Sequence, residues 1–239
     1  MNTEKRSGYY LILGSMGVLI PYMILQQIFD YPNILRFDVK IVLEKFNQGG
    51  VKLIITWWAF ALLGLPLIVA YIKIGQRLEQ RILYLRWITT VGTLGLVLQM
   101  IGLLRWALVV PILSEHYMQG NAAVRASTAM QFRIMNQFLG VALGEHLGQL
   151  FTITWTVLFA HALLKLKLIA KWFAIMAFVT SAIYFLAQSE LVATVIPGSP
   201  VAPYSGLVGS TLWIIWLFIL GIKLAAGAIS FKEIAPEIS

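Results

Sequence analysis

The chain has 239 residues, of which 59% are hydrophobic and only 12% are charged, and its mean hydropathy is +0.82. An ordinary soluble domain has about 25% charged residues, so this composition indicates a membrane protein and excludes a disordered chain or a coiled coil. The formal net charge is +8, but the basic residues lie in short clusters between apolar runs, which excludes a nucleic-acid-binding surface. Because there is no cysteine, disulfides, thiolate metal sites and cysteine nucleophiles are also excluded.

Six segments are long and apolar enough to cross a bilayer, whose core is about 30 Å thick and needs about 20 mainly apolar residues per helix. They are 8–28, 52–73, 87–110, 138–164, 168–187 and 206–228. Lys5 and Arg6 precede the first segment as in a signal peptide, but its apolar core is too long and no small-residue cleavage site follows, so we expect a retained helix. The sequence predicts an all-α polytopic membrane protein, a bundle of six transmembrane helices in a single integral membrane domain over residues 1–239.

Lysine and arginine near the helix ends predict the orientation. With the N-terminus inside, eleven basic residues fall on the inner side and seven on the outer side. The short inner connections 74–86 and 165–171 contain most of the excess, and short cytoplasmic loops are the ones enriched in positive charge. We therefore expect both termini in the cytoplasm.

One outer connection carries an amphipathic pattern. In residues 31–50 five apolar side chains share one helical stripe: Leu35, Val39, Val42, Leu43 and Phe46. Charged residues lie elsewhere around the helix, and Gly49-Gly50 follows as a stop signal. We expect a short amphipathic helix that lies at the outer membrane interface.

Prolines and polar runs predict the remaining irregularities. Residues 114–137 look helical and are expected to extend the fourth span outward. In 188–205 a proline recurs every third residue from Pro197, which favours an extended, polyproline-like connector. Pro21 and Pro66 lie inside predicted spans and are expected to kink them.

Two charged residues lie inside apolar spans, where a charge usually faces protein and has a partner. Arg105 lies nineteen residues after the inner Arg86, about 28 Å along span three at 1.5 Å per residue. Glu145 lies twenty residues before the inner Lys165, about 30 Å along span four. We expect both at the same level near the outer face, where they would form an ion pair.

Helical periodicity places small residues beside these charges. Span three has a stripe of Gly92, Gly95, Gln99, Gly102 and Trp106, and span four has a face of Gly140, Gly144 and Gly148 beside a polar stripe of Glu145, Gln149, Thr152 and Thr156. Glycines let helices approach closely. We expect spans three and four to meet through these residues and to place Arg105, Glu145 and Gln149 around a shared internal region, with Gln99 deeper and turned aside.

Candidate roles follow from these positions. The proposed ligand-binding residues are Arg105, Gln99, Gln149, Trp58 and Trp106; the proposed acid–base residues are Glu145 and His146. A fixed cation, hydrogen-bonding amides and aromatic walls suit an amphipathic ligand. The Arg105–Glu145 pair could instead only fix helix register. The sequence has no metal-binding histidine spacing and no phosphate or dinucleotide motif, so we expect no metal and no cofactor.

The stretches GLLRWALVVPIL (102–113) and NQFLGVALGEHLGQLFTITWTVL (136–158) resemble an uncharacterised family of bacterial six-helix membrane proteins that carries a domain-of-unknown-function label. The matching residues include Arg105, Trp106, Gly144, Glu145 and His146. The resemblance implies an integral bacterial membrane protein and no established activity; from the predicted topology we expect the inner (cytoplasmic) membrane.

Three functional hypotheses result. The leading one is binding of a lipophilic or amphipathic small molecule, or a membrane lipid, in an outward-facing intramembrane polar cavity. The second is a membrane enzyme that uses Glu145 or His146 in acid–base chemistry on a lipid-soluble substrate. The third is an accessory subunit that contacts a second copy or another membrane protein through the Gly140, Gly144 and Gly148 face; no nucleic-acid partner is expected.

Overall fold

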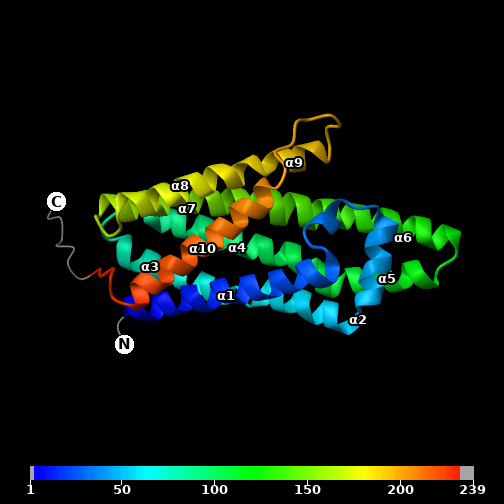
Figure 1. The fold of residues 1–239 in the computed structure, drawn as a ribbon, viewed down its shortest axis with the longest axis horizontal. Helices are drawn as coiled ribbons and strands as arrows, with labels where there is room; N and C mark the ends of the chain where they lie inside the picture. Colours follow the sequence, from blue (N-terminus) through cyan, green and yellow to red (C-terminus); the bar gives the residue numbers. More distant parts are fainter. Residues whose placement is uncertain (1–2, 232–239) are drawn as a thin grey trace. The chain divides into compact units, whose positions relative to one another are not determined.

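The computed structural model describes residues 3–231 and is 83% helical, with no strand in this part of the chain. Its helices, in chain order, are α1 (Thr3–Phe29), η1 (Asn33–Arg36), α2 (Val39–Leu62), α3 (Leu65–Leu78), α4 (Leu85–Leu108), α5 (Val110–Gln119), α6 (Ala122–Met135), η2 (Asn136–Leu147), α7 (Gly148–Lys165), α8 (Lys171–Leu186), α9 (Gln188–Ala193) and α10 (Ser205–Ala225) (Figure 1).

Six helical stretches are long and apolar enough to cross a membrane: Thr3–Phe29, Val39–Leu78, Leu85–Gln119, Ala122–Lys165, Lys171–Ala193 and Ser205–Ala225. Each contains one of the predicted segments almost entirely. Helices are suited to this role because they satisfy their backbone hydrogen bonds internally, without water. The predicted all-α membrane fold is confirmed.

The chain forms two compact units. Unit 1 consists of the described residues up to Met16, of Gly64–Val97 and of the described residues from Gly148 onward; unit 2 consists of Gly17–Leu63 and Leu98–Leu147. Helices α1 and α4 contribute their first part to unit 1 and their second part to unit 2. The expectation of a single integral membrane domain stays a prediction.

In unit 1, α8 packs against both α7 and α10 (Figure 1). The contact between α8 and α10 is close because Gly209 has no side chain: a Cβ there would lie 2.5 Å from Tyr184 Cα. The indole Nε1 of Trp216 donates to the carbonyl of Phe173 at 3.0 Å. These contacts fix the register of two antiparallel helices.

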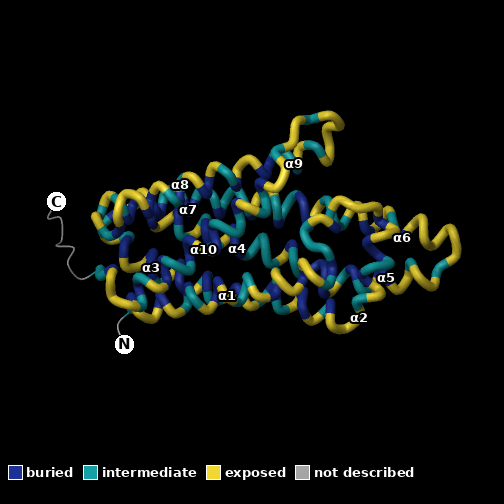
Figure 2. The backbone as a smooth tube through the Cα atoms, in the orientation of Figure 1, coloured by how far each residue is buried: buried dark blue, intermediate teal, exposed yellow. Residues whose placement is uncertain are grey.

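Unit 2 has an aromatic core. Trp57 and Trp106 stack with ring centroids 4.9 Å apart, and Phe29 meets both rings edge-on. Helices α5 and α6 form a hairpin (Figure 1) whose tip is exposed (Figure 2). The side chain of Asn121 caps α6 by accepting from Val124 N at 3.0 Å. The core and the hairpin together hold the second half of α4 and all of η2.

The amphipathic segment begins later than expected. A 3-10 helix, η1, precedes α2, which starts at Val39 after its cap residue Asp38. Gly50 (φ 53°, ψ −150°) interrupts α2 where the stop was expected. The predicted stripe is buried at Val39, Val42, Leu43 and Phe46. It packs into the aromatic core of unit 2, and Ser114 Oγ donates to the carbonyl of Leu43 at 2.8 Å. The apolar stripe therefore packs against the protein core rather than against lipid.

Other connections also differ from expectation. The 114–137 region is two helices, so only α6 extends the fourth span, whereas α5 extends the third. The 188–205 connector begins with α9, because its first six residues contain no proline; the irregular chain starts after Ala193. Pro66 lies in the first turn of α3, after a break at Leu63-Gly64, and α1 continues through Pro21. Pro66 thus marks a helix start, a position that suits proline.

Candidate functional site

The segment from Asn136 to Leu147 is a π-helix of twelve residues. In a π-helix each hydrogen bond spans five residues, and most examples are single turns that occur often at functional sites. This helix, η2, carries Asn136, Gly140, Gly144 and Glu145. Because its turns contain more residues than an α-helical turn, side-chain directions calculated at 100° per residue do not hold along it.

Glycines bring α4 and η2 into backbone contact within unit 2. A Cβ on Gly102 would lie 2.9 Å from Gly144 Cα, and a Cβ on Gly140 would lie 2.6 Å from Arg105 Cζ. Gly140 therefore leaves the space that the guanidinium occupies. In unit 1, a Cβ on Gly95 would lie 3.2 Å from the carbonyl oxygen of Gly148. The prediction that spans three and four meet through small residues is confirmed.

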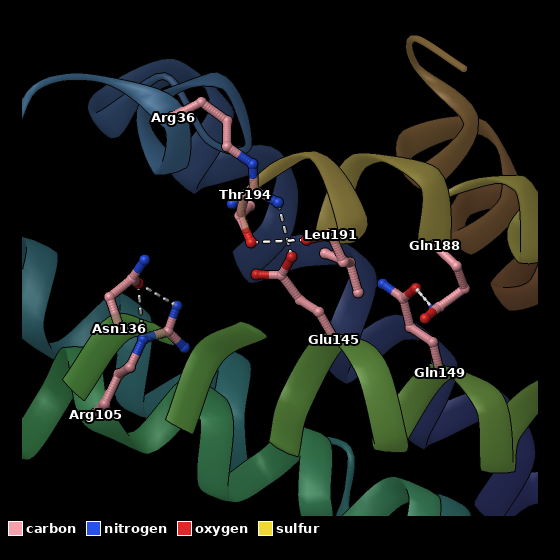
Figure 3. A network of polar contacts seen from close by, with 8 residues as sticks. All are labelled: Arg36, Arg105, Asn136, Glu145, Gln149, Gln188, Leu191 and Thr194. Carbon is pink, nitrogen blue, oxygen red and sulfur yellow. Dashed lines mark hydrogen bonds and ion pairs between the residues drawn. The ribbon is translucent and has the colours of Figure 1, made fainter. Parts of the chain in front are cut away.

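Arg105 is buried, with 5% of its surface exposed. Its Nη2 and Nε donate to Asn136 Oδ1 at 3.0 and 3.3 Å, and its Nη1 donates to the carbonyl of Gly102. Its Cζ lies 5.1 Å from the centroid of the Trp106 ring. Figure 3 shows the Arg105 and Asn136 side chains pointing toward each other. These contacts hold a buried cation with neutral acceptors.

Glu145 pairs with Arg36, which was not among the sequence-based site residues. Arg36 Nη2 lies 2.9 Å from Glu145 Oε2, and the two side chains are 30% and 20% exposed. Figure 3 shows Arg36 reaching from η1 onto the carboxylate. The expectation of a direct Arg105–Glu145 ion pair is wrong. The sequence indicates how deep each residue lies along its span, but it contains no local signal that a connecting segment from elsewhere in the chain reaches Glu145.

We call Arg36, Arg105, Asn136 and Glu145 the charged site. Glu145 and Arg36 both act electrostatically on the Arg105 guanidinium. Two guanidinium groups and one carboxylate leave one positive charge in excess. Guanidinium groups bind carboxylates and phosphates with two parallel hydrogen bonds, so the arrangement suits an acidic group.

Two of the proposed ligand-binding residues lie elsewhere. Gln149 belongs to unit 1, where its Oε1 accepts from Gln188 Nε2 at 2.8 Å (Figure 3). Trp58 is 40% exposed, whereas Trp57 is fully buried and stacks on Trp106. The hydropathy of adjacent tryptophans is identical, so the sequence could not tell which ring faces the core. Gln99 is half-buried in unit 2.

The acid–base residues differ in exposure. His146 is exposed, while Glu145 is half-buried and its carboxylate is the counter-charge of Arg36. Within residues 3–231, no three histidine, aspartate or glutamate side chains are grouped to hold a metal ion. The geometry gives the enzyme hypothesis no specific support.

The glycine face expected to contact a partner is filled by the chain itself. Gly140, Gly144 and Gly148 are all buried, Gly140 under Arg105 and Gly144 against Gly102. Within the chain, α4 therefore occupies the space beside Gly140 and Gly144. Contact with a second copy or another membrane protein through this face stays a prediction.

A family described as a domain of unknown function, DUF4386, matches residues 7–221, a range that contains both stretches on which the resemblance was based. No curated protein and no solved structure matches the chain.

Proposed function

We propose that this chain, which belongs to the DUF4386 family of domains of unknown function, binds an amphipathic small molecule or lipid with an acidic headgroup at the charged site of unit 2. Because the family carries no known function, the proposal is inferred from the chain's own residues. The ligand's headgroup would be a carboxylate or phosphate. Arg105 supplies the fixed positive charge, Arg36 a second one, and Asn136 and Glu145 orient the two guanidinium groups.

The observation that carries the proposal is the environment of Arg105. The side chain lies in an apolar span, is almost fully buried and is held by the amide oxygen of Asn136 and a backbone carbonyl. A charge in such a place is costly and is typically found where a substrate or ion binds. The nearby carboxylate of Glu145 is already engaged with Arg36, so an acidic ligand would complete the charge balance.

The surroundings suit the apolar part of such a ligand. Trp106 lies beside the guanidinium, and the aromatic core of unit 2 continues from it through Trp57 and Phe46. Arg36 and Glu145 retain partial exposure, which supports entry of the headgroup from their side. Aromatic walls beside a few converging polar groups are typical of sites for amphipathic molecules.

The finer location is also proposed: the cytoplasmic membrane of a bacterium, with both termini inside. The basic connections 74–86 and 165–171 support this orientation; the C-terminus itself lies outside the described residues. Since the chain has no cysteine, single cysteines at the exposed positions Gln80 and Ala123 test it directly. A membrane-impermeant maleimide added to intact cells should label Ala123→Cys and leave Gln80→Cys unlabelled; the reverse pattern would invert the orientation.

The binding proposal is tested with purified protein in phosphatidylcholine nanodiscs. Oleate is the probe, and methyl oleate, which has the same chain without the charge, is its control. We expect oleate to bind more tightly than methyl oleate, and Arg105→Gln to remove most of that difference. Asn136→Asp places a carboxylate where the amide oxygen of Asn136 faces Arg105. This carboxylate should compete with the acidic headgroup of the ligand and weaken oleate binding at least tenfold.

Arg133→Gln is the matched control, because it removes an exposed arginine of α6 and should leave oleate affinity unchanged. Equal affinity for the two probes in the wild-type protein, or full oleate affinity in both Arg105→Gln and Asn136→Asp, would refute the proposal. Equal losses in Arg133→Gln would show that only the general surface charge matters, which also contradicts it.

A further inference from the structure

The positive charge of unit 1 is concentrated at one end of its helices. Ten basic residues lie at the start of α1, around the α3–α4 and α7–α8 connections and at the end of α10: Lys5, Arg6, Lys73, Arg77, Arg81, Arg86, Lys165, Lys167, Lys171 and Lys223. Glu4 and Glu79 are the acidic residues among them. The excess of positive charge here equals the net charge of +8 of the whole chain. We call these ten residues the basic end.

The helix ends that carry these residues contact one another. Arg77 Nη2, at the end of α3, donates to Thr3 Oγ1 at the start of α1 at 2.9 Å. A Cβ on Gly8 of α1 would lie 2.5 Å from Ala225 N at the end of α10. Figure 1 shows these helix ends and the α7–α8 connection on the same side of unit 1. The basic residues therefore belong to one surface.

One corner of the basic end combines cations with an exposed aromatic ring. Lys223 Nζ of α10 lies 5.7 Å from the ring centroid of Trp172 and 5.6 Å from that of Phe173, both at the start of α8. At these distances the rings attract the ammonium group and help to keep it at the end of the helix. Trp172 is 56% exposed, and Lys171 beside it is also exposed. Two cations therefore flank an exposed indole.

Exposed apolar side chains continue from this corner along α8. Ile175 and Val179 follow Trp172 at the spacing of one helical face and are 46% and 52% exposed. The membrane-spanning stretch begins at Lys171, so Trp172 lies at the level where aromatic side chains meet lipid headgroups. Ile175 and Val179 lie deeper, at the level of acyl chains. The face thus suits a molecule with an anionic head and an apolar tail.

Lys167 adds a third cation at a backbone position that favours glycine. Its φ is 56°, in the turn that ends α7, where Leu168 N donates to the Leu163 carbonyl at 2.9 Å. Glycine adopts this conformation with the least strain. Within residues 3–231, no carboxylate forms an ion pair with Lys167, Lys171 or Lys223. Three positive charges are therefore available to an anionic group from outside the described chain.

We propose that this corner of the basic end binds an anionic phospholipid, with the three lysines around the phosphate, Trp172 at the glycerol backbone and the acyl chains along the exposed face of α8. The surface of a cytoplasmic leaflet is negatively charged and attracts basic segments, and the proposed orientation places this end on that side. A free phosphate would use the lysines but not the apolar face, whereas a phospholipid uses both.

Native mass spectrometry of the purified protein in a neutral detergent tests the proposal. The probes are phosphatidylglycerol and phosphatidylcholine with the same acyl chains, and the readout is the fraction of protein that retains a lipid. We expect phosphatidylglycerol to be retained under conditions that remove phosphatidylcholine. Removal of each lysine should weaken this binding about fivefold, and Lys171→Gln/Lys223→Gln about twenty-five-fold. Lys167→Gly should weaken it about fivefold while the unfolding temperature stays equal or rises, an opposition that a purely structural lysine would not produce.

Control variants locate the bound lipid. Lys40→Gln/Lys52→Gln removes two exposed lysines of α2 in unit 2 and should leave phosphatidylglycerol bound. Arg105→Gln should also leave it bound, so this site and the charged site can be told apart. Equal retention of the two lipids, or full retention in Lys171→Gln/Lys223→Gln, would overturn the proposal. So would an equal loss in the α2 double variant, or displacement of the lipid by glycerol 3-phosphate, which would indicate a site for a free phosphate group.

Discussion

The charged site of unit 2 and the buried hydroxyls of unit 1 differ in how far their polar groups are satisfied. In unit 2 the polar groups of the charged site are charged and hydrogen-bonded: Arg105 donates to Asn136 and Glu145 pairs with Arg36. In unit 1 the hydroxyl oxygens of Ser15, Thr93 and Ser181 are buried without a hydrogen bond of ordinary geometry. A buried charge cannot be left uncompensated, whereas an unpaired hydroxyl lowers stability only modestly. Removing a polar group of the charged site should therefore destabilise unit 2, whereas removing one of these hydroxyls should stabilise unit 1.

The largest effect is expected where unit 2 depends on backbone contact. Gly102→Val would place side-chain atoms against Gly144 Cα and the Leu139 carbonyl, which a Cβ alone would approach to 2.9 and 3.0 Å. Overpacking against backbone that cannot move should cost about 3 kcal/mol of the free energy of unfolding. Thermal unfolding in detergent measures it. Gly206→Ala is the control, because its Cβ would meet only Ala187 Cβ, at 3.5 Å; similar losses in both variants would contradict the close contact.

The second effect concerns the neutral acceptor of Arg105. Asn136→Ala removes the oxygen that accepts from Nε and Nη2, and a lost hydrogen bond to a buried charge should cost about 2 kcal/mol. Asn136→Asp should be at least as stable as the wild type, because it supplies an acceptor and a counter-charge. Unfolding temperatures of the two variants decide the point: if both are equally destabilised, Asn136 acts through its shape rather than through its oxygen.

A smaller change of opposite sign is expected in unit 1. Ser181→Ala deletes a buried hydroxyl that has no hydrogen bond of ordinary geometry, so it should stabilise the protein by about 1 kcal/mol. Calorimetric or fluorescence-detected unfolding provides the measurement. A loss of stability would mean that the Ser181 hydroxyl makes a stronger hydrogen bond than its geometry suggests, and the contrast between the units would fail at this residue.

The smallest effect is expected at the partly exposed ion pair. A double-mutant cycle with Arg36→Gln and Glu145→Gln should give a coupling free energy of about 0.5–1 kcal/mol, since solvent weakens pairs of this exposure. Unfolding of the wild type, both single variants and the double variant yields the number. A coupling near zero would show that Arg36 is not held by Glu145 and would remove the second cation from the charged site.

Much of the fold was predictable because hydropathy is a local property. The six apolar stretches and the approach of α4 and η2 through Gly102 and Gly144 follow from residue type and spacing. Arg105 and Glu145 were identified for the same reason, as charges that interrupt apolar runs. The amphipathic stripe from Val39 to Phe46 was found by periodicity, although its burial against protein rather than lipid was not.

The hydrogen-bond and ion-pair partners of Arg105 and Glu145 could be identified only from the tertiary structure. Asn136 has no feature that marks it as the acceptor for Arg105, and Arg36 counted only as an outer basic residue until η1 brought it to Glu145. Trp57 and Trp58 differ in direction by one residue's rotation around the helix, and hydropathy cannot show which of the two rings faces the core.

What the amino-acid sequence determined by itself is therefore a membrane protein of six apolar helices with a buried arginine and a glycine-lined helix contact, because transfer into lipid depends on each residue's own chemistry. What only the tertiary structure decided is which groups satisfy those charges and which hydroxyls are left without partners. The π-helix of Asn136–Leu147 is the physical reason for much of this: its wider turns redirect every side chain along it, and such a change arises from packing rather than from local preference.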